Sequence, residues 1–504
     1  MRWNKSLVGS FLLVALFLLV AFFRIVLAFQ TPVPDYEGFR VLLQVDQVLS
    51  SSWQDVLVSG TPLFPFLLAF FGLFLPKLWL VKVVPNIFAA TAVFPAYSLG
   101  RVLSQHRRFG LFSALFVGVV PAFVLAGLND GSSLGLSVTL LLSALFLFVR
   151  VRSSKVWLRW LLLVLSFLML LQMNSFVLLF GLLWYLLLLR LLQVKVSGKD
   201  VEVTLFYLFS LSWLTMVLWK RSLVAHGLRV IWQNIPQEEL SHFFSHLTLV
   251  QVLVGSGLLT LLLGSYALYQ SVMVDHRKPL LLLTGMLFAT IILLWMRALP
   301  LRNGLALLSV LLAVASSYAL QLFSLYLMKT KAARFTSISL VGVALLFLLI
   351  ALPSDVALAQ EASLSSAPAA ADVALAEWAS SHLPVDAVIL ASPQEGFFLE
   401  ATAHRKVVLD EDYLFQSHVE ERYLDSREVY QAVFKTDAVG LMQKYGASYL
   451  WVSLRTKEFS GVLRPSFLRE DDCFRLVRDE QDDAHVKVWL YERVCSLRSS
   501  EVSS

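Results

Sequence analysis

Acidic side chains in short polar segments between apolar stretches are the best candidates for chemistry in this sequence. Asp35 and Glu37 follow the first apolar stretch in PDYEGFR, and Asp130 stands in LNDGSS between two later stretches. A segment as short as the second has both ends fixed by helices, so its carboxylate is held in place. Carboxylate oxygens bind hard divalent cations such as Mg²⁺ or Mn²⁺, and a carboxylate also serves as a general base. We predict catalytic roles for these three acids, and both kinds of chemistry remain open.

Basic side chains near the ends of later apolar stretches complement these acids. Arg297 and Arg302 stand in WMRALPLRNG, and Arg229 belongs to the segment 220–247, which also carries Glu238 and Glu239 in NIPQEEL. The planar fork of a guanidinium matches a phosphate with two parallel hydrogen bonds. We predict that the three arginines bind the phosphate of a donor; the alternative for Arg297 is contact with lipid head groups. Acids and arginines together suit transfer from a lipid-linked phosphate.

The composition shows what kind of scaffold must position these groups. Of 504 residues, 58% are hydrophobic and 15% are charged, and the mean hydropathy is +0.73. These values exclude a single soluble domain and predict a polytopic α-helical membrane protein, since a span needs about 20 apolar residues. Eleven spans are expected, near 6–29, 79–100, 109–127, 132–149, 157–173, 176–192, 203–219, 248–270, 279–297, 304–327 and 335–352. The short apolar run 62–76 is interpreted as an interfacial helix.

Charge gives the orientation of the chain. Residues 1–354 hold 26 Lys/Arg and 10 Asp/Glu, whereas residues 355–504 hold 15 and 25. If 62–76 does not cross, most basic residues of the first part fall in short loops on one side, which the positive-inside rule places in the cytoplasm. The acidic C-terminal region then lies outside, as do Asp35, Asp130 and Glu238. Membrane topology therefore explains the high pI, and we expect no nucleic-acid partner.

The C-terminal region is predicted to be a separate domain. The transmembrane domain is expected at 1–352, an Ala/Ser/Pro-rich linker at 353–371 and an extracytoplasmic α/β domain at 372–504. Expected elements are a helix from Asp372 to His382, strands at 385–391 and 449–453, a helix at 427–445, and a closing hairpin at 473–478 and 486–493. Cys473 and Cys495 lie near the ends of this hairpin, so an oxidising exterior allows a disulfide; two free thiols are the alternative.

Several stretches resemble the GT-C superfamily of membrane glycosyltransferases, most closely the catalytic subunit of oligosaccharyltransferase. The similarity to the family's two acidic motifs lies in DYEGFR and in GLFSALFVGVVPAFVLAGLND, whose aspartates are 95 residues apart. Further similarity lies in PNIFAATAVFPAYSLGRVL, in RNGLALLSVLLAVASSYAL and in LAEWASSHLPVDAVILASPQEGFFLEATAHRKVVLDED.

The resemblance implies a site and a reaction. Asp35 and Asp130 would bind a divalent metal such as Mg or Mn, with Glu238 or Glu239 from a later outer loop, and Arg302 would lie near the donor phosphate. A sugar or oligosaccharide would pass from a polyprenyl-(pyro)phosphate donor to a protein or glycan acceptor on the extracytoplasmic face.

Two departures from the family pattern qualify this expectation. The segment 392–396 reads SPQEG where the family has WWDYG, which leaves Gln394 and Glu395 as the candidate contacts to an acceptor. The second acidic motif reads Asn129-Asp130-Gly131, with one acid in place of two, so metal-independent transfer with an acid as base is the alternative.

We therefore predict an oligosaccharyltransferase-like membrane glycosyltransferase, located in the cell membrane of a prokaryote or the endoplasmic reticulum of a eukaryote. Two alternatives stay open. One is a non-catalytic homologue that acts as an assembly or binding subunit. The other is a transporter of lipid-linked glycans, which would place broken helices and charges at the bilayer midplane.

Overall fold

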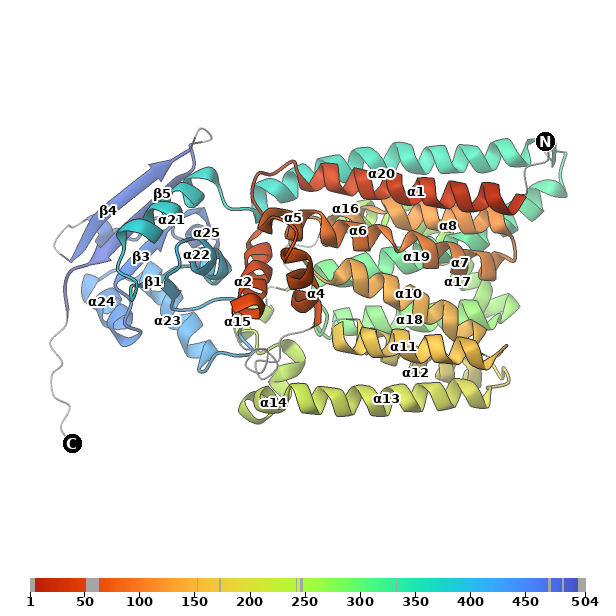
Figure 1. Ribbon diagram of the computed structural model, residues 1–504, viewed down its shortest axis with the longest axis horizontal. Helices are drawn as coiled ribbons and strands as arrows, with labels where there is room; N and C mark the ends of the chain where they lie inside the picture. The colour runs from red at the N-terminus through yellow and green to blue at the C-terminus, as the bar shows by residue number, and fades with distance from the viewer. Residues whose placement is uncertain are drawn as a thin grey trace. The chain divides into compact units, whose positions relative to one another are not determined.

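A computed structural model describes residues 5–50, 63–151, 153–171, 174–241, 243–244, 248–331, 333–469, 473–482 and 485–496. The chain divides into two compact units (Figure 1). Unit 1 comprises Met1–Pro32, Ser51–Lys220 and His242–Ala362, and unit 2 comprises Val33–Ser50, Arg221–Ser241 and Ser363–Ser504.

Unit 1 is helical, and its long helices run roughly parallel to one another (Figure 1). In chain order, the helices of unit 1 are α1 (Lys5–Ala28), α4 (Leu63–Gly72), α5 (Lys77–Lys82), α6 (Val84–Ala90), α7 (Val93–Ser104), α8 (Arg107–Val119), α9 (Pro121–Leu125), α10 (Leu134–Arg150), α11 (Lys155–Leu171), α12 (Ser175–Leu191), α13 (Gly198–Leu218), α16 (Leu249–Ser256), α17 (Leu258–Gln270), α18 (Lys278–Trp295), α19 (Leu301–Met328) and α20 (Thr336–Ser366).

Within the described residues, seven helical stretches are long and apolar enough to cross a membrane: Val8–Ala28, Lys77–Ser104, Gly198–Leu218, Leu258–Asp275, Lys278–Trp295, Leu301–Met328 and Ala333–Ala362. Shorter apolar helices occupy Leu63–Gly72, Leu134–Arg150 and Ser175–Leu191. The chain is thus a multi-pass membrane protein, as predicted, while the count of eleven spans stays a prediction. Helix α4 has 10 residues, about 15 Å, which is half of the ~30 Å hydrocarbon core.

Small residues let the helices of unit 1 approach closely. Helix α19 is buried along most of its length and is rich in alanine and serine. At Gly264 in α17, an added Cβ would lie 2.7 Å from the carbonyl oxygen of Leu312 in α19. At Gly285 in α18, it would lie 2.8 Å from the backbone nitrogen of Tyr185 in α12. Lipid tails are as apolar as the surfaces of these helices, so the hydrophobic effect does not drive the helices together. Close backbone packing at small residues stabilises their association instead.

The predicted span 109–127 is interrupted. Helix α8 ends at Val119, Pro121 occupies the first turn of α9, and α9 ends at Leu125. Residues 126–133, here called the Asp130 loop, are irregular and contain Gly127 and Gly131 with φ of 89° and 64°. Positive φ values suit glycine, which has no Cβ. The loop therefore turns tightly between α9 and α10, leaving backbone groups that other parts of unit 1 must satisfy.

Unit 2 is an α/β unit with one mixed sheet (Figure 1). The strands β1 (Val388–Leu390), β2 (Lys406–Val407), β3 (Tyr449–Val452), β4 (Phe474–Gln481) and β5 (Lys487–Arg493) have the order β2-β1-β3-β5-β4. Strand β1 pairs in parallel with β2 and β3, whereas β5 pairs antiparallel with β3 and β4. The helices and helical turns are α2 (Tyr36–Ser50), α14 (Lys220–His226), η1 (Gly227–Trp232), α15 (Gln237–Ser241), α21 (Ala370–His382), η4 (Pro393–Glu395), α22 (Gly396–Thr402), α23 (Val419–Gln431), α24 (Lys435–Lys444), α25 (Leu454–Ser460) and η5 (Ser466–Arg469).

The predicted C-terminal α/β domain is confirmed, with differences at its edges. The single helix expected at 427–445 is two helices, α23 and α24. The linker expected at 353–371 is largely helical, because α20 continues through Pro353 to Ser366. One missing N–H does not end this helix, since the residues that follow include good helix formers such as Ala, Leu, Gln and Glu.

Two segments that were expected to be outer loops belong to unit 2. Helix α2 packs its aromatic side chains on α22: the rings of Tyr36 and Phe39 lie edge-on to Phe398, with centroids 5.8 and 5.2 Å away. The segment Arg221–Ser241 likewise belongs to unit 2. Unit 2 is therefore built from three separate parts of the chain.

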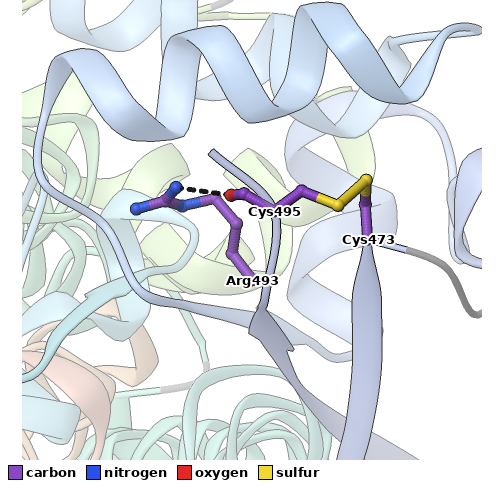
Figure 2. The surroundings of a disulfide bond; sticks show 3 residues. All are labelled: Cys473, Arg493 and Cys495. Carbon is purple, nitrogen blue, oxygen red and sulfur yellow. Dashed lines mark hydrogen bonds between the residues drawn. A yellow bond between two sulfur atoms is a disulfide. The ribbon is translucent and has the colours of Figure 1, made fainter. Parts of the chain in front are cut away.

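A disulfide closes the C-terminal hairpin. Cys473 directly precedes β4, Cys495 follows β5, and their sulfur atoms are bonded (Figure 2). Arg493 donates a hydrogen bond of 2.8 Å from Nη1 to the carbonyl oxygen of Cys495 and one of 3.0 Å from Nε to that of Ala447.

Candidate functional site

Asp130 is buried at one end of unit 1, and its carboxylate has two partners. Only 3% of the residue is exposed. Its Oδ1 accepts a 2.9 Å hydrogen bond from the backbone N–H of Ser132, and its Oδ2 lies 3.4 Å from Nη1 of Arg302 at the start of α19. The Arg302 side chain is 38% exposed. The structure thus joins the predicted acid to one of the predicted phosphate-binding arginines.

Side chains from three helices donate hydrogen bonds to backbone carbonyl groups in the segment 123–128, just before Asp130. Arg24 of α1 donates to the carbonyl oxygen of Phe123 at 3.0 Å, and Arg302 donates to that of Leu125. Asn86 of α6 donates to that of Leu128 at 2.7 Å. These carbonyls lie near or beyond the end of α9, where the regular helical hydrogen bonds stop, and unpaired backbone groups in an apolar environment cost several kcal/mol each. The three side chains therefore fix the path of the chain to Asp130.

A second set of hydrogen bonds ties the Asp130 loop to the end of α1. Lys82 is fully buried and donates to the carbonyl oxygen of Ala28 at 2.9 Å and to both oxygens of Thr31. The hydroxyl of Thr31 also accepts a 2.9 Å hydrogen bond from Nδ2 of Asn129, the neighbour of Asp130. An ammonium group has three N–H donors, and these three oxygen atoms give each of them an acceptor.

The roles of Arg24 and Asn86 were missed by the sequence analysis. Arg24 is the one charged residue inside the apolar stretch 6–29, which is a recognisable signal because a charge at membrane depth is a functional hypothesis by default. Asn86 gives a weaker signal, since polar residues in spans are common.

The predicted acids of the first outer segment lie in unit 2. Asp35 is 6% exposed and directly precedes α2, whereas Glu37 is exposed in the first turn of that helix. On the same helix, Arg40 lies 3.3 Å from Asp412.

Carboxylates from three segments of unit 2 gather around Glu411. Burial, together with the nearby carboxylates of Glu37 and Glu239, raises the pKa of Glu411 to about 8. Burial also raises the pKa of Glu239, which accepts a 2.8 Å hydrogen bond from the hydroxyl of Tyr413. Glu411 was not singled out from the sequence; the signal was its place in the acidic run VVLDED. Like charges in a desolvated site favour protonation or a bound cation.

In the described part of the chain, no group of three or more His, Cys, Asp and Glu side chains has the arrangement needed to hold a metal ion. Asp35 and Glu239 belong to unit 2 and Asp130 to unit 1. The convergence of these acids on one metal therefore stays a prediction.

The segment 221–241 differs from the open outer loop that was expected. Glu238 pairs with Arg427 of α23, and Arg229 lies 3.9 Å from Glu420. Asn234 donates a 2.9 Å hydrogen bond to the carbonyl oxygen of Tyr413. Glu238 and Arg229 already have partners of opposite charge in unit 2, so the roles predicted for them would require these pairs to open.

Arg297 lies at the end of α18 and adopts a left-handed backbone conformation, with φ of 59°. Its guanidinium lies 5.9 Å from the ring centroid of Phe244. It is half-buried, and its predicted contact with a donor phosphate stays a prediction.

The two predicted acceptor contacts differ in accessibility. Gln394 is exposed, whereas Glu395 is fully buried. The Glu395 carboxylate accepts hydrogen bonds from Nε1 of Trp451 at 2.9 Å and from the hydroxyl of Ser392 at 2.6 Å. Burial raises the pKa of Glu395. Contact of Glu395 with an acceptor would therefore require these hydrogen bonds inside unit 2 to open.

Comparison with known proteins concerns the fold. No family model matches the chain, and no curated protein matches its sequence. Among solved structures, archaeal oligosaccharyltransferase AglB from Archaeoglobus fulgidus, in complex with an inhibitory peptide and a dolichol-phosphate, has a TM-score of 0.63 at 14% identity, over 97% of this chain and 74% of that one. The Archaeoglobus fulgidus oligosaccharyltransferase in complex with Zn and sulfate has a TM-score of 0.59 at 13% identity, over 88% and 68%.

A third structure is similar along nearly its whole length. ArnT from Cupriavidus metallidurans, bound to undecaprenyl phosphate, has a TM-score of 0.52 at 14% identity, over 95% of this chain and 97% of that one. At these identities the likeness shows the fold alone: the chain shares the fold of AglB and ArnT.

Proposed function

We propose that this protein is a membrane glycosyltransferase of the GT-C type. It moves a sugar or oligosaccharide from a polyprenyl-(pyro)phosphate donor to an acceptor on the extracytoplasmic face. The fold supports this proposal, as do the lipids named for its structural neighbours, dolichol-phosphate for AglB and undecaprenyl phosphate for ArnT.

The observation that carries the proposal is the ion pair between Asp130 and Arg302. Arg302 is partly exposed, so a donor phosphate can share its guanidinium with the Asp130 carboxylate. Negative charge develops on the phosphate oxygen as the bond to the sugar breaks, and a fixed guanidinium stabilises that charge. Asp130, released from part of its pairing, is then a base or an orienting group for the acceptor.

Positively charged side chains near Asp130 support a phosphate ligand. Arg302 forms an ion pair with Asp130, and Arg24 and Lys82 donate hydrogen bonds to the carbonyl oxygens of Phe123 and Ala28. Cationic side chains gathered in one place favour an anion over a neutral ligand.

We further propose that a divalent metal is held by Asp35, Asp130 and either Glu239 or Glu238. Their oxygens are the hard ligands that Mg²⁺ and Mn²⁺ prefer. When bound, the metal would neutralise charge on the donor's phosphates. The alternative remains transfer without a metal, with Asp130 as the base.

One observation favours the second candidate, a non-catalytic binding or assembly subunit. The segment 392–396 is largely buried and hydrogen-bonded within unit 2, which leaves Gln394 as its exposed polar side chain. This segment therefore offers few groups for reading an Asn sequon, as expected of a subunit that binds or assembles without catalysing transfer.

The test is transfer from a polyprenyl-linked sugar by the purified protein in nanodiscs. We expect Asp130→Ala and Asp35→Ala each to lower kcat by at least about 100-fold, the scale of losing general-base catalysis. The control is Asp200→Asn, which removes a buried carboxylate of α13 that bonds to Tyr185, and which should keep most activity. Normal transfer by correctly folded Asp130→Ala would rule out the catalytic assignment and favour the non-catalytic candidate.

A further inference from the structure

A cavity in unit 1 lies at the far end of α10 from the Asp130 loop. Its volume is about 500 Å³, within the range of about 300–1,000 Å³ that is typical of ligand sites. Helix α10 has 17 residues and is therefore about 25 Å long, so a ligand in this cavity is too distant to react at Asp130. The described residues that line it come from the last turns of α7 and α10 and from the positions just after them: Arg101, Val102, Gln105, Val149, Arg150 and Ser153.

Two arginines give this cavity its charge. Arg101 belongs to α7 and Arg150 to α10, and both are exposed. Within the described residues, no carboxylate forms an ion pair with either of them. Two guanidinium groups on neighbouring helices favour an anion between them, and their planar forks match the oxygens of a phosphate.

The surroundings of Arg150 favour a lipid phosphate over a small soluble anion. The Arg150 guanidinium lies 5.9 Å from the ring centroid of Phe146, and that ring lies edge-on to Trp157 of α11 with the centroids 6.1 Å apart. Tryptophan is enriched where the hydrocarbon core meets the head groups, which is the depth of a lipid phosphate. Val102 and Val149 add apolar surface to the lining. The cavity therefore offers both a charged and an apolar surface to one ligand.

We propose that this cavity binds the head group of an anionic phospholipid, with Arg101 and Arg150 as the ligands of its phosphate. Gln105 and Ser153 supply further polar groups to the lining. The positive-inside rule predicts that this end of unit 1 is cytoplasmic, and basic pockets between helices on that side of a membrane protein bind anionic head groups. The site is separate from the Asp130 site, so the inference does not depend on the proposed function.

Lipid binding to the full-length protein tests the proposal, with native mass spectrometry from detergent micelles as the readout. Phosphatidylglycerol should bind at least about tenfold more tightly than phosphatidylcholine, whose choline group cancels the charge of its phosphate. The double variant Arg101→Gln/Arg150→Gln should lose this preference. Equal binding of the two lipids by the wild type, or a full preference in the double variant, would overturn the proposal.

The matched control is Arg190→Gln/Arg334→Gln. It removes the same charge from two exposed arginines of unit 1 that are outside the cavity lining, and Arg190 likewise stands in the last turn of a helix, α12. The preference for phosphatidylglycerol should change less than about twofold, because salt screens charges that are remote from the bound lipid. An equal loss in the control would show attraction to the whole basic surface and would reject a site in the cavity.

A third variant tests the cavity without removing charge. Ser153 is exposed and lines the cavity, so Ser153→Trp should fill part of it and leave both arginines in place. The preference for phosphatidylglycerol should fall about as far as in Arg101→Gln/Arg150→Gln, with the elution volume on size exclusion unchanged. An undiminished preference in Ser153→Trp would contradict binding inside the cavity.

Inorganic phosphate is the other source of the same chemistry. Radiolabelled phosphate should not bind measurably to the wild-type protein in phosphatidylcholine nanodiscs at micromolar concentration. Phosphate binding that is lost in Arg101→Gln/Arg150→Gln would assign the cavity to free phosphate and reject the lipid.

Discussion

At the residue scale, the site depends on polar side chains that replace missing backbone hydrogen bonds. Asn86 is the clearest case, because it accepts from Arg24 and donates to the carbonyl oxygens of Lys82 and Leu128. All of these groups are buried. An amide with both donors and its acceptor in use is hard to replace, since any apolar side chain leaves several polar groups unsatisfied.

Replacement of Asn86 by leucine, which has a similar size, should lower the free energy of unfolding by about 2–4 kcal/mol, given the penalty for unsatisfied buried groups. Binding of a polyprenyl phosphate should weaken at the same time. Asn174→Leu is the control, because it also removes a buried amide, one that donates to Ser137 at 2.7 Å. Thermal unfolding and lipid binding of both variants check this: an equal loss of lipid binding in the control would contradict a specific role for Asn86.

A second prediction at this scale concerns pH. Burial and the neighbouring Glu395 raise the pKa of Asp372 from its usual 3.8 to about 7. The folded state therefore binds a proton more tightly than the unfolded state, so stability from this group is complete below about pH 4 and is lost as pH rises to 7.

Asp372→Asn should make the full-length protein more stable than the wild type at pH 7 to 8 and flatten its loss of stability between pH 4 and 7. Thermal unfolding in detergent across this range measures both. Asp386→Asn, an exposed carboxylate of the same unit, should leave the profile unchanged. A steeper profile in Asp372→Asn than in the wild type would show that the carboxylate is stabilising when ionised.

At the element scale, unit 2 incorporates segments from distant parts of the chain. Helix α2 and the segment 221–241 join the C-terminal region through aromatic contacts and ion pairs. Arg405 reinforces the end of α21, where it donates to the carbonyl oxygens of Ser380 and Leu383. Short helices of this kind have little stability alone and need such partners.

The closing hairpin carries the prediction for this scale. The disulfide joins residues 22 apart in the sequence, and a cross-link over such a loop stabilises by about 3 kcal/mol. The double variant Cys473→Ser/Cys495→Ser should lose about 3 kcal/mol of this stabilisation. The expected result is faster proteolysis within 474–493. Reductant should produce the same change in the wild type and none in the variant. Wild-type resistance to proteolysis that survives reduction would show that the sheet alone holds the hairpin.

At the scale of the whole molecule, charge is segregated along the chain. The first 354 residues are strongly basic and the remainder is acidic. The multi-pass helical unit and the positive-inside rule together predict opposite membrane faces for the basic loops and the acidic region.

Cysteine labelling tests this orientation, and the chain suits it because both cysteines are in the disulfide and none is free. Gln105→Cys stands in a basic loop of unit 1 and Ser381→Cys in unit 2, and both positions are exposed. A membrane-impermeant maleimide applied to intact cells should label Ser381→Cys alone, and Gln105→Cys should react only after permeabilisation. Labelling of both from outside would overturn the predicted topology.

The sequence by itself determined the membrane character, the positions of most long helices, the α/β nature of the C-terminal region and the importance of Asp130 and Arg302 as candidates. These follow from apolar length, charge and local motifs, which are properties of contiguous residues. Only the tertiary structure showed three further features. Asp130 pairs with Arg302, and Arg24 and Asn86 donate hydrogen bonds to backbone carbonyl groups near the end of α9. Helix α2 and the segment 221–241 belong to unit 2. Each of these features depends on contacts between residues that are far apart in the sequence. A polar side chain in an apolar stretch must have a hydrogen-bond partner, but the local sequence does not say which backbone group that partner is.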